Sequence, residues 1–359
     1  MKKKVVIFFF FFLITISISG EEKHDTLFLT IDEYIKEYLA QSVIIKEAVR
    51  KLEKAEKDLR RATEERVAAL ILRRYEIEVN AAKLALTEAE RKEKINAVQR
   101  YFQRLQTYRN FITAKRKLQL EEKKLRVTSL RYESGLCTEI EFLQHNNEFM
   151  KINYEVEKAQ YEYFHAKREF LLGIGKEKGD TIPLEIKLTF DEIEKYDTMI
   201  CVQKAYTVDS VYYYNREMLL LAKKQWEAVH TLEDATPEER KNITDELNRT
   251  EENYQLYKKE LYNKIIGLIE EHNSLNCQRE LLEKQAIIVR RELEVLKTRF
   301  RQGEINQIEF EEVSLELHEL EDQIKQMEET LFQKELSLKV LIGDDPLQYI
   351  YKIVSVSPK

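Results

Sequence analysis

The residues that could carry out chemistry are few in this sequence, and they do not fall into spacings that catalysis or metal binding requires. The chain has 359 residues and six His, none of them in an HxxH or HExxH pattern that would hold zinc. It contains no Gly-x-Ser-x-Gly elbow, phosphate-binding loop or Gly-x-Gly-x-x-Gly fingerprint. We therefore predict no enzyme activity, no catalytic or cofactor-binding residues and no metal site.

The cysteines also argue against a metal site or a disulfide framework. There are three, an odd number, and they are far apart in the sequence: Cys137, Cys201 and Cys277. No C-x-x-C pattern is present. The sequence favours small apolar packing or a loose thiol for each of them.

Composition predicts long helices with solvated faces. The chain has only 8 Gly and 4 Pro, and 35% of its residues are charged. This composition is typical of long helices and coiled coils rather than sheets. The 59 basic and 65 acidic residues nearly balance, to a net charge of −6. Alternating signs usually mark a solvated helix face, and no basic block suited to nucleic acid is present.

One 45-residue stretch occurs twice and organises the chain. Arg131–Phe142 begins the first copy and Arg299–Phe310 begins the second, 168 residues later. Nine of the 45 aligned positions are identical, and six further apolar positions align along the second arm of each copy. These apolar residues step by three, four and seven, which places them on one helix face. In the first copy they are Phe149, Ile152, Val156, Ala159, Tyr163 and Phe170; in the second, Leu317, Leu320, Ile324, Met327, Leu331 and Leu338.

Each copy is predicted to be a helical hairpin with a tight tip. A charged helix ends at Gly135 or Gly303, where a left-handed cap residue fits. Thr138 with Glu141 forms a capping-box pattern for the next helix, and Asn306 with Glu309 forms a looser version. Two such hairpins in one orientation indicate an internal duplication.

The N-terminal residues have the pattern of an export signal. Residues 1–19 contain three lysines, a Phe-rich apolar run of about fifteen residues and small residues at the end. These are the parts of a secretory signal peptide, and the run is short for a membrane span of about 20 residues. Cleavage is the favoured interpretation and an uncleaved anchor the alternative. Either way, we expect an exported protein of the cell envelope.

The rest of the chain divides into two repeats. Leu29-Thr-Ile-Asp-Glu-Tyr34 opens the first and Leu188-Thr-Phe-Asp-Glu-Ile193 opens the second, which is longer by nine residues. We predict repeat 1 at 27–175, a linker at 176–187, repeat 2 at 188–345 and a tail at 346–359. Helices are expected to about residue 66, then over 81–134 and 139–172. In repeat 2 they are expected over 191–232 and, capped by Thr236, on to 302.

With these motifs, the chain resembles the TolC family of outer-membrane efflux ducts. The resemblance rests on the opening LT-x-[DE]-E, the doubled R-[YF]-x-x-G-x-x-x-x-[ILV]-[DE]-[FV] at the tips and the apolar run ending I-G in each half. It implies a protomer of duplicated antiparallel helical hairpins that assembles as a homotrimer, with β-barrel strands in the outer membrane. It also implies a passive conduit in the outer membrane and periplasm, in contact with a periplasmic adaptor protein and an inner-membrane pump. For this chain we predict an all-α fold of such hairpins with little or no β-structure.

The chain departs from the family at the β-barrel strands. A membrane strand needs roughly 9–11 residues. In repeat 1 the only candidate for a strand is residues 67–79, within which Arg74–Val79 alternates polar and apolar residues. The corresponding part of repeat 2 has the pattern of a helix, a turn and a second helix. The barrel is therefore expected to be reduced or missing. This leaves membrane contact open, together with the oligomeric state and the transported substrate.

The resemblance also assigns roles to individual residues. It places adaptor docking at the tips, on Arg131, Gly135, Leu136, Arg299 and Gly303. It places a ring of pore-narrowing acids at Glu309 and Glu312, which would attract cations.

Each of these residues also has a simpler interpretation. The arginines could cap helix carbonyls, and Glu309 could serve only in capping. Glu312 could lie on a solvated face, and Tyr212–Tyr214 could pack between helices rather than form a membrane-interface belt.

Two functions follow from these patterns. The first is an exit-duct component of an efflux or secretion assembly. The second is an envelope-located or secreted coiled-coil protein that keeps the helices and spans no membrane.

Overall fold

The computed structural model describes residues 27–176, 181–183, 186–188, 196–346 and 354–356. The signal sequence predicted at 1–19 lies outside these residues. So do parts of the predicted linker and tail, and residues 189–195, which include Thr189 of the second opening motif.

The described chain forms two successive sets of four helices. The first set is α1 (Ile31–Gln41), α2 (Val43–Glu64), α3 (Ala69–Glu133) and α4 (Glu139–Gly173). The second set is α5 (Thr198–Val208), α6 (Ser210–Thr231), α7 (Pro237–Arg301) and α8 (Gln307–Leu341). Helix lengths are 11, 22, 65 and 35 residues in both sets. The predicted all-α fold of duplicated hairpins is confirmed, and the equal lengths are in keeping with a duplication.

The strands of the described chain are short and pair at the boundaries of the helical sets. β1 (Leu27–Leu29) runs parallel to β2 (Thr181–Pro183), with Leu27 opposite Thr181. β3 (Ile186–Leu188) runs antiparallel to β4 (Val354–Val356), with Ile186 opposite Val356. Each strand has three residues, so helices carry the architecture.

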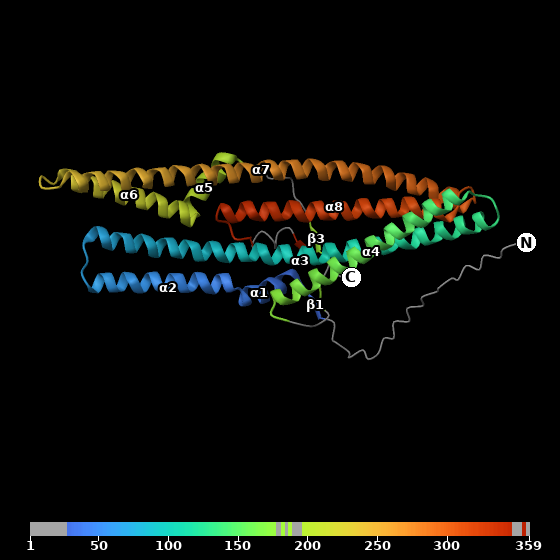
Figure 1. The fold of residues 1–359 in the computed structure, drawn as a ribbon, viewed down its shortest axis with the longest axis horizontal. Helices are drawn as coiled ribbons and strands as arrows, with labels where there is room; N and C mark the ends of the chain where they lie inside the picture. Colours follow the sequence, from blue (N-terminus) through green and yellow to red (C-terminus); the bar gives the residue numbers. More distant parts are fainter. Residues whose placement is uncertain (1–26, 177–180, 184–185, 189–195, 347–353, 357–359) are drawn as a thin grey trace, which may run out of the picture.

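The helices form one elongated layer (Figure 1). α3 and α7 run along the long axis, and the two hairpin tips lie together at one end. In the half nearer the tips the packing order is α7–α8–α3–α4, and in the other half it is α7–α6–α3–α2. The outer members of the layer are therefore α7 on one side and α2 and α4 on the other.

Residues 74–79, which alternate like a strand, lie inside helix α3, and α3 begins at Ala69 rather than near residue 81. Ile77 and Val79 are both buried, although they point to different sides of the helix. α3 is packed by α2 on one side and by α6 on the other, so apolar residues occur on two faces. Burial on two sides of a helix therefore produced the alternating pattern.

The helix predicted to run to residue 66 is broken at Ser42. The Ser42 hydroxyl accepts a hydrogen bond from the Ile45 amide at 3.2 Å and donates one to Glu93 of α3 at 2.7 Å. In the second set, the break at Asp209 is followed by Ser210, which donates to Glu88 of α3 at 2.8 Å. Both breaks thus place a serine against a carboxylate of the same helix, α3. Helix α5 is capped by Asp197, whose side chain accepts from the Ile200 amide.

An aromatic core joins the two sets near the middle of the layer. Tyr34 stacks on Phe170 with 4.1 Å between ring centroids, and its hydroxyl donates to the Phe170 carbonyl. Phe102 of α3 meets Phe332 of α8 edge to face at 5.8 Å. These rings are almost fully buried, so the core fixes α1, α4 and α8 around α3.

Two further features bear on the sequence analysis. Cys201 is buried, Cys137 is partly buried and Cys277 is exposed, and all three are free thiols. Within the described ranges, no helix is both long enough and apolar enough to cross a membrane.

Replacing Gly173 tests the core. A Cβ there would lie 2.6 Å from the Tyr34 hydroxyl oxygen and 3.0 Å from a Tyr38 ring carbon. We expect Gly173→Ala to lower the free energy of unfolding by ~1–3 kcal/mol through overpacking, as measured by denaturant unfolding.

Gly267, in the middle of α7, is the matched control because nothing lies within 4 Å of its added Cβ. Gly267→Ala should stabilise the chain by up to about 1 kcal/mol, since alanine favours the helix. Equal effects at both glycines would contradict the close approach at Gly173.

Candidate functional site at the hairpin tips

The two tips are built by the same backbone turn. Gly135 and Gly303 have φ angles of +71° and +75°, which side-chain-bearing residues rarely adopt. The amide after each glycine donates to the carbonyl of the arginine one turn earlier, from Leu136 to Arg131 at 2.7 Å and from Glu304 to Arg299 at 3.0 Å. This is the Schellman end of a helix, and it reverses the chain within a few residues.

The helices that follow are capped as the spacing predicted. Thr138 and Glu141 form a full capping box, with 3.2 Å from the Glu141 amide to the threonine hydroxyl and 2.8 Å from the Thr138 amide to the carboxylate. Asn306 caps α8 by accepting from the Glu309 amide at 3.0 Å, and its amide group donates to the Glu309 carboxylate at 2.8 Å. The looser version predicted for the second tip is confirmed.

An aromatic pair closes each tip. The sequence analysis assigned no role to these four aromatic residues. Tyr132 stacks on Phe142 at 5.2 Å with 12° between the ring planes. Phe300 stacks on Phe310 at 5.4 Å with 15° between the planes. The signal was present, because the repeated motif has an aromatic residue after the arginine and a Phe at its end. The pairs hold the two arms of each tip side by side.

The tip residues with predicted docking roles lie on the surface. Leu136 is 70% exposed, and Arg131 and Arg299 are exposed too. At the tip ends of α3 and α7, the last helix carbonyls accept hydrogen bonds from backbone amides. The arginine side chains therefore do not cap these carbonyls. Arg299 instead reaches across its turn to the Glu304 carboxylate at 3.3 Å. Hydrogen bonds from Thr138 lower the pKa of Glu141, and the charge of Arg131 contributes to the shift.

The two acids with predicted pore roles have different surroundings. Glu309 is exposed and engaged with Asn306, as the capping interpretation expects. Glu312 forms an ion pair with Lys124 of α3 at 2.7 Å, and its side chain is 44% exposed. Glu312 therefore lies where the first hairpin meets the second, rather than on a simple solvated face.

This meeting line, the α3–α8 seam, is polar along much of its length. It begins near the tips with Lys123 and Glu311, whose charged atoms are 2.6 Å apart. It ends at Arg109 and Glu329, also 2.6 Å apart, with both side chains 9% exposed. Between these pairs lie two further contacts, Lys117–Glu319 at 2.9 Å and Thr113–Asp322 at 2.8 Å. The two hairpins are thus joined by ion pairs and hydrogen bonds.

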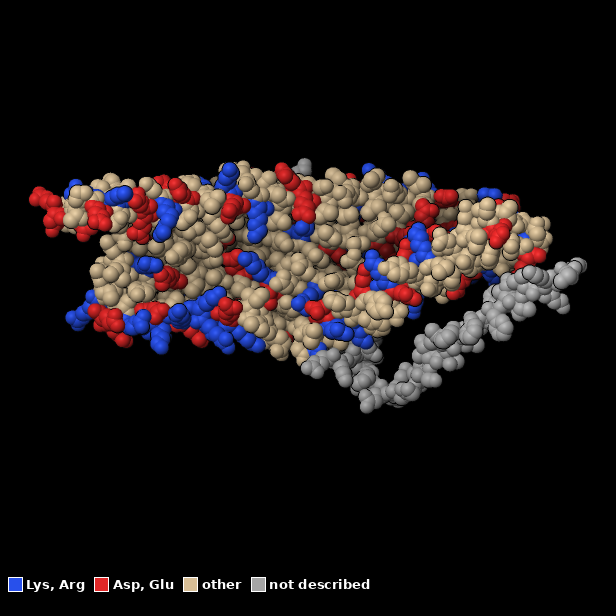
Figure 2. Space-filling model, in the orientation of Figure 1, with Lys and Arg blue, Asp and Glu red and all other residues tan. Residues whose placement is uncertain are grey.

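The ion pairs near the tips shift pKa values. The hydrogen bond from Lys123 lowers the pKa of Glu311 below its ordinary value of 4.5. Burial alone would lower the pKa of Lys124, but hydrogen bonds with Glu121 and Glu312 raise it. Figure 2 shows the wider surface, where both signs are interspersed along the helices. Lys and Arg gather over α2, and Asp and Glu gather at the turn between α6 and α7.

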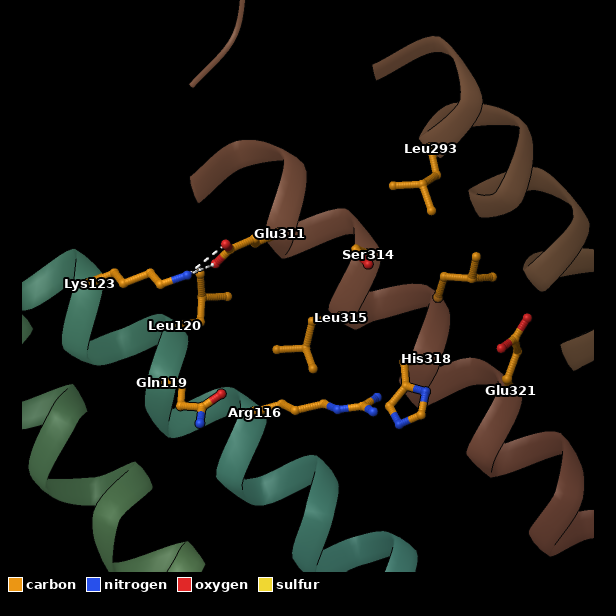
Figure 3. Close-up of a pocket in the computed structure, with 11 residues that line it drawn as sticks. Arg116, Gln119, Leu120, Lys123, Leu293, Glu311, Ser314, Leu315, His318 and Glu321 are labelled. Atoms are coloured by element: carbon orange, nitrogen blue, oxygen red, sulfur yellow. Dashed lines mark hydrogen bonds and ion pairs between the residues drawn. The ribbon is translucent and has the colours of Figure 1, made fainter. Parts of the chain in front are cut away.

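A pocket of about 440 Å³ opens in this seam (Figure 3). Lys123 and Glu311 join across one end, Arg116 extends toward His318, and Leu293 reaches the pocket from α7. The wall mixes leucines with both charge signs and is open to solvent. It has the character of a groove between helices rather than a shaped binding site.

The remaining candidate groups serve packing. Tyr212 is buried, stacks on Tyr206 at 4.4 Å and lies in hydrogen-bond distance of the Tyr254 hydroxyl, so its packing interpretation is confirmed. Over the part of the chain that the structure describes, no three or more His, Cys, Asp or Glu gather as a metal site.

Comparison with solved structures identifies the fold. The chain superposes on the CusC transmembrane channel with a TM-score of 0.65 at 12% identity, covering 91% of this chain and 96% of CusC. It superposes on the outer-membrane channel OprN with a TM-score of 0.67 at 11% identity, covering 88% and 90%. For the outer membrane protein VceC of Vibrio cholerae the TM-score is 0.58 at 13% identity, covering 88% and 96%.

The chain therefore has the fold of the outer-membrane efflux channels, and the resemblance predicted from the doubled tip motif is confirmed at the level of the fold. A comparison with models of known protein families found no match, and a comparison with curated protein sequences found none either.

The α3–α8 seam should respond to acid through Glu311. Its folded pKa is depressed, so its contribution to stability is present above pH 4.5 and is lost as pH falls through the folded value. We expect the melting temperature to fall over this range, and to fall less in Glu311→Gln. The difference should shrink in high salt because the pair is largely exposed.

The control is Glu316→Gln, an exposed carboxylate on the same helix. Glu316→Gln should leave the dependence of the melting temperature on pH unchanged. An acid profile in Glu311→Gln identical to that of the unaltered chain would show that the Lys123–Glu311 pair does not couple folding to pH.

Proposed function

We propose that this protein is the exit-duct component of an export assembly in the cell envelope, a passive conduit made of helical hairpins. The proposal depends mainly on one observation: two hairpin tips of the same construction lie side by side at one end of a layer that has the fold of outer-membrane channels. A conduit needs no reacting groups, which agrees with the absence of catalytic motifs from the sequence.

In this proposal the duct is a homotrimer. A single layer with the order α7–α8–α3–α4 has an outer surface on two sides and encloses no lumen by itself. Copies arranged in a ring would enclose one. The exposed apolar side chains on α4 and α7 support such an arrangement, because contiguous apolar surface usually marks an interface.

The tips are proposed to contact a periplasmic adaptor protein, which in turn joins an inner-membrane pump. Leu136 is exposed at the apex of the first tip, where its backbone is fixed by the turn at Gly135. A rigid, exposed apolar residue is the kind of anchor that protein interfaces use. The arginines beside the turns would add hydrogen bonds to such a contact.

The second candidate is a coiled-coil scaffold of the envelope that spans no membrane. The turns at the end opposite the tips favour it, because residues 65–68 and 232–236 join long helices directly. Arg240 of α7 even hydrogen-bonds back to the Leu232 carbonyl at 3.0 Å across the second turn. In this candidate function the tips remain contact sites, but the protein forms no conduit.

Light scattering with and without detergent, followed by reconstitution into liposomes, separates the two candidates. A duct should purify as a trimer and release a trapped small solute from the liposomes. A scaffold should leave the solute trapped whatever its oligomeric state. A monomer that releases nothing would overturn the duct proposal.

Adaptor docking is tested by a photo-reactive residue at Leu136. We expect it to crosslink to an envelope protein in cells. Leu232 is the control, because it lies in the turn at the opposite end and is 53% exposed. Crosslinks of equal yield to the same protein at both positions would contradict docking through the tips.

The pore-acid role is tested on Glu309. If three copies place this carboxylate around one axis, Glu309→Gln should reduce the cation preference of the reconstituted conductance about twofold or more. Glu304→Gln, on the same tip, is the control and should change it less. Unchanged selectivity in Glu309→Gln would leave this residue with its capping role alone.

A further inference from the structure

Another cavity lies at the break between α1 and α2, far from the hairpin tips. The break is beside α3 and the end of α4 (Figure 1). The cavity has a volume of about 310 Å³, and its wall includes three acidic or basic side chains, those of Glu93, Arg100 and Glu169. Tyr38 and Leu172 also line it. Charged and apolar surface therefore meet where three helices come together.

Glu93 of α3 is the buried acid of this wall, and it is only 3% exposed. The Ser42 hydroxyl and the Asn96 amide group each donate a hydrogen bond to its carboxyl group at 2.7 Å. Both donors are neutral, and among the described residues no basic side chain lies within 4.0 Å of this carboxyl group. Buried acids are usually paired with a cation, and a carboxylate can accept more than two hydrogen bonds. Glu93 thus has room for a cationic partner that the described chain does not supply.

Arg100, the base of the same wall, is already engaged. Its guanidinium group donates to the Glu169 carbonyl at 2.9 Å and to the Glu169 carboxylate at 3.1 Å. It also lies over the Tyr38 ring, 5.7 Å from the ring centroid. Burial raises the pKa of Tyr38, and the negative charge of Glu93 adds to the shift, so this ring and the carboxyl group share one environment. With Arg100 and Glu169 paired, Glu93 is the acid of the wall that remains without a counterion.

The second set of helices shows that the fold does not require charges at these places. Helices α3 and α4 correspond to α7 and α8 with a shift of 168 residues. All three acidic or basic side chains of the cavity have uncharged counterparts there. Glu93, Arg100 and Glu169 correspond to Leu261, Leu268 and Ser337. Leu261 is buried in an apolar cluster against which Leu268 packs. The polar wall is therefore particular to the first set of helices.

We propose that this cavity binds an organic amine, with its ammonium group on Glu93 and its apolar body along the rim. An ammonium group donates three hydrogen bonds, and bonds between charged groups are the stronger ones. The Tyr38 ring offers the same ammonium group an aromatic face. The rim is apolar and open to solvent, since Val43, Ile44 and Leu172 line the cavity and are 73%, 54% and 50% exposed.

Other classes of ligand fit this wall less well. An organic anion would place its charge beside two acids and a base that is already paired. A metal ion would find a single unpaired carboxyl group, and in the part of the chain that the structure describes no three His, Cys, Asp or Glu gather as a metal site. A neutral ligand would leave Glu93 without a counterion. Because the cavity lies within one chain, the proposal does not depend on the duct function.

Titration of the full chain with hexylammonium tests the site, with binding followed by saturation-transfer NMR at neutral pH. We expect a dissociation constant on the order of 1 mM, since the probe is small. Hexanol and hexanoate, which have the same apolar body, should bind more weakly and should compete poorly. Glu93→Gln should weaken hexylammonium binding about tenfold or more, because the charged hydrogen bond is lost, and should leave hexanol binding unchanged.

Glu88→Gln is the matched control. Glu88 lies on the same helix and also accepts a hydrogen bond from a serine at a helix break, from Ser210 at 2.8 Å. It differs in having its own cation, Lys92 at 2.6 Å, and it does not line the cavity. Glu88→Gln should therefore leave hexylammonium binding unchanged.

A second variant keeps the test valid if Glu93→Gln does not fold. Leu172 lies on the rim and is half exposed, so Leu172→Ser should fold and should weaken hexylammonium binding about threefold through lost apolar contact.

The proposal is overturned if hexanol or hexanoate binds as well as hexylammonium. Equal losses of hexylammonium binding in Glu93→Gln and Glu88→Gln would also overturn it, as would unchanged binding in a folded Glu93→Gln or in Leu172→Ser.

Discussion

Most of this structure depends on one constraint: α3 must bury apolar side chains on two sides at once. A helix of 65 residues covered on one side only would leave much of its surface to water. Here α2 and α4 cover one side, and α6 and α8 cover the other (Figure 1). The aromatic core, the serine contacts at the helix breaks and the α3–α8 seam all follow from placing α3 between these neighbours.

The counterpart helix α7 has the same length but a different position. It is covered by α6 and α8 on one side, and its outer face carries exposed leucine, isoleucine and valine. A helix derived from the same pattern is thus central in one repeat and peripheral in the other. This difference makes the two sides of the chain unlike each other.

The contacts of the α3–α8 seam differ in what would weaken them. Exposed ion pairs such as Lys123–Glu311 contribute little at high salt because their charges are screened. The buried Arg109–Glu329 pair is a firmer point of the seam, because removing one partner would leave a buried charge. We therefore expect the seam to loosen near the tips before it loosens at Arg109–Glu329.

The sequence by itself determined the local structure around the tips. Gly135, Gly303 and the capping residues act on neighbours a few positions away, so their turns follow from residue type. The composition and the doubled motif together predicted the fold class. Longer-range features were decided by tertiary packing: Arg74–Val79 became helix because α3 is buried on two sides, and Glu312 became an ion-pair partner because Lys124 lies on a helix nearly two hundred residues away. No local pattern can specify such contacts, since they exist only once the two hairpins are packed together.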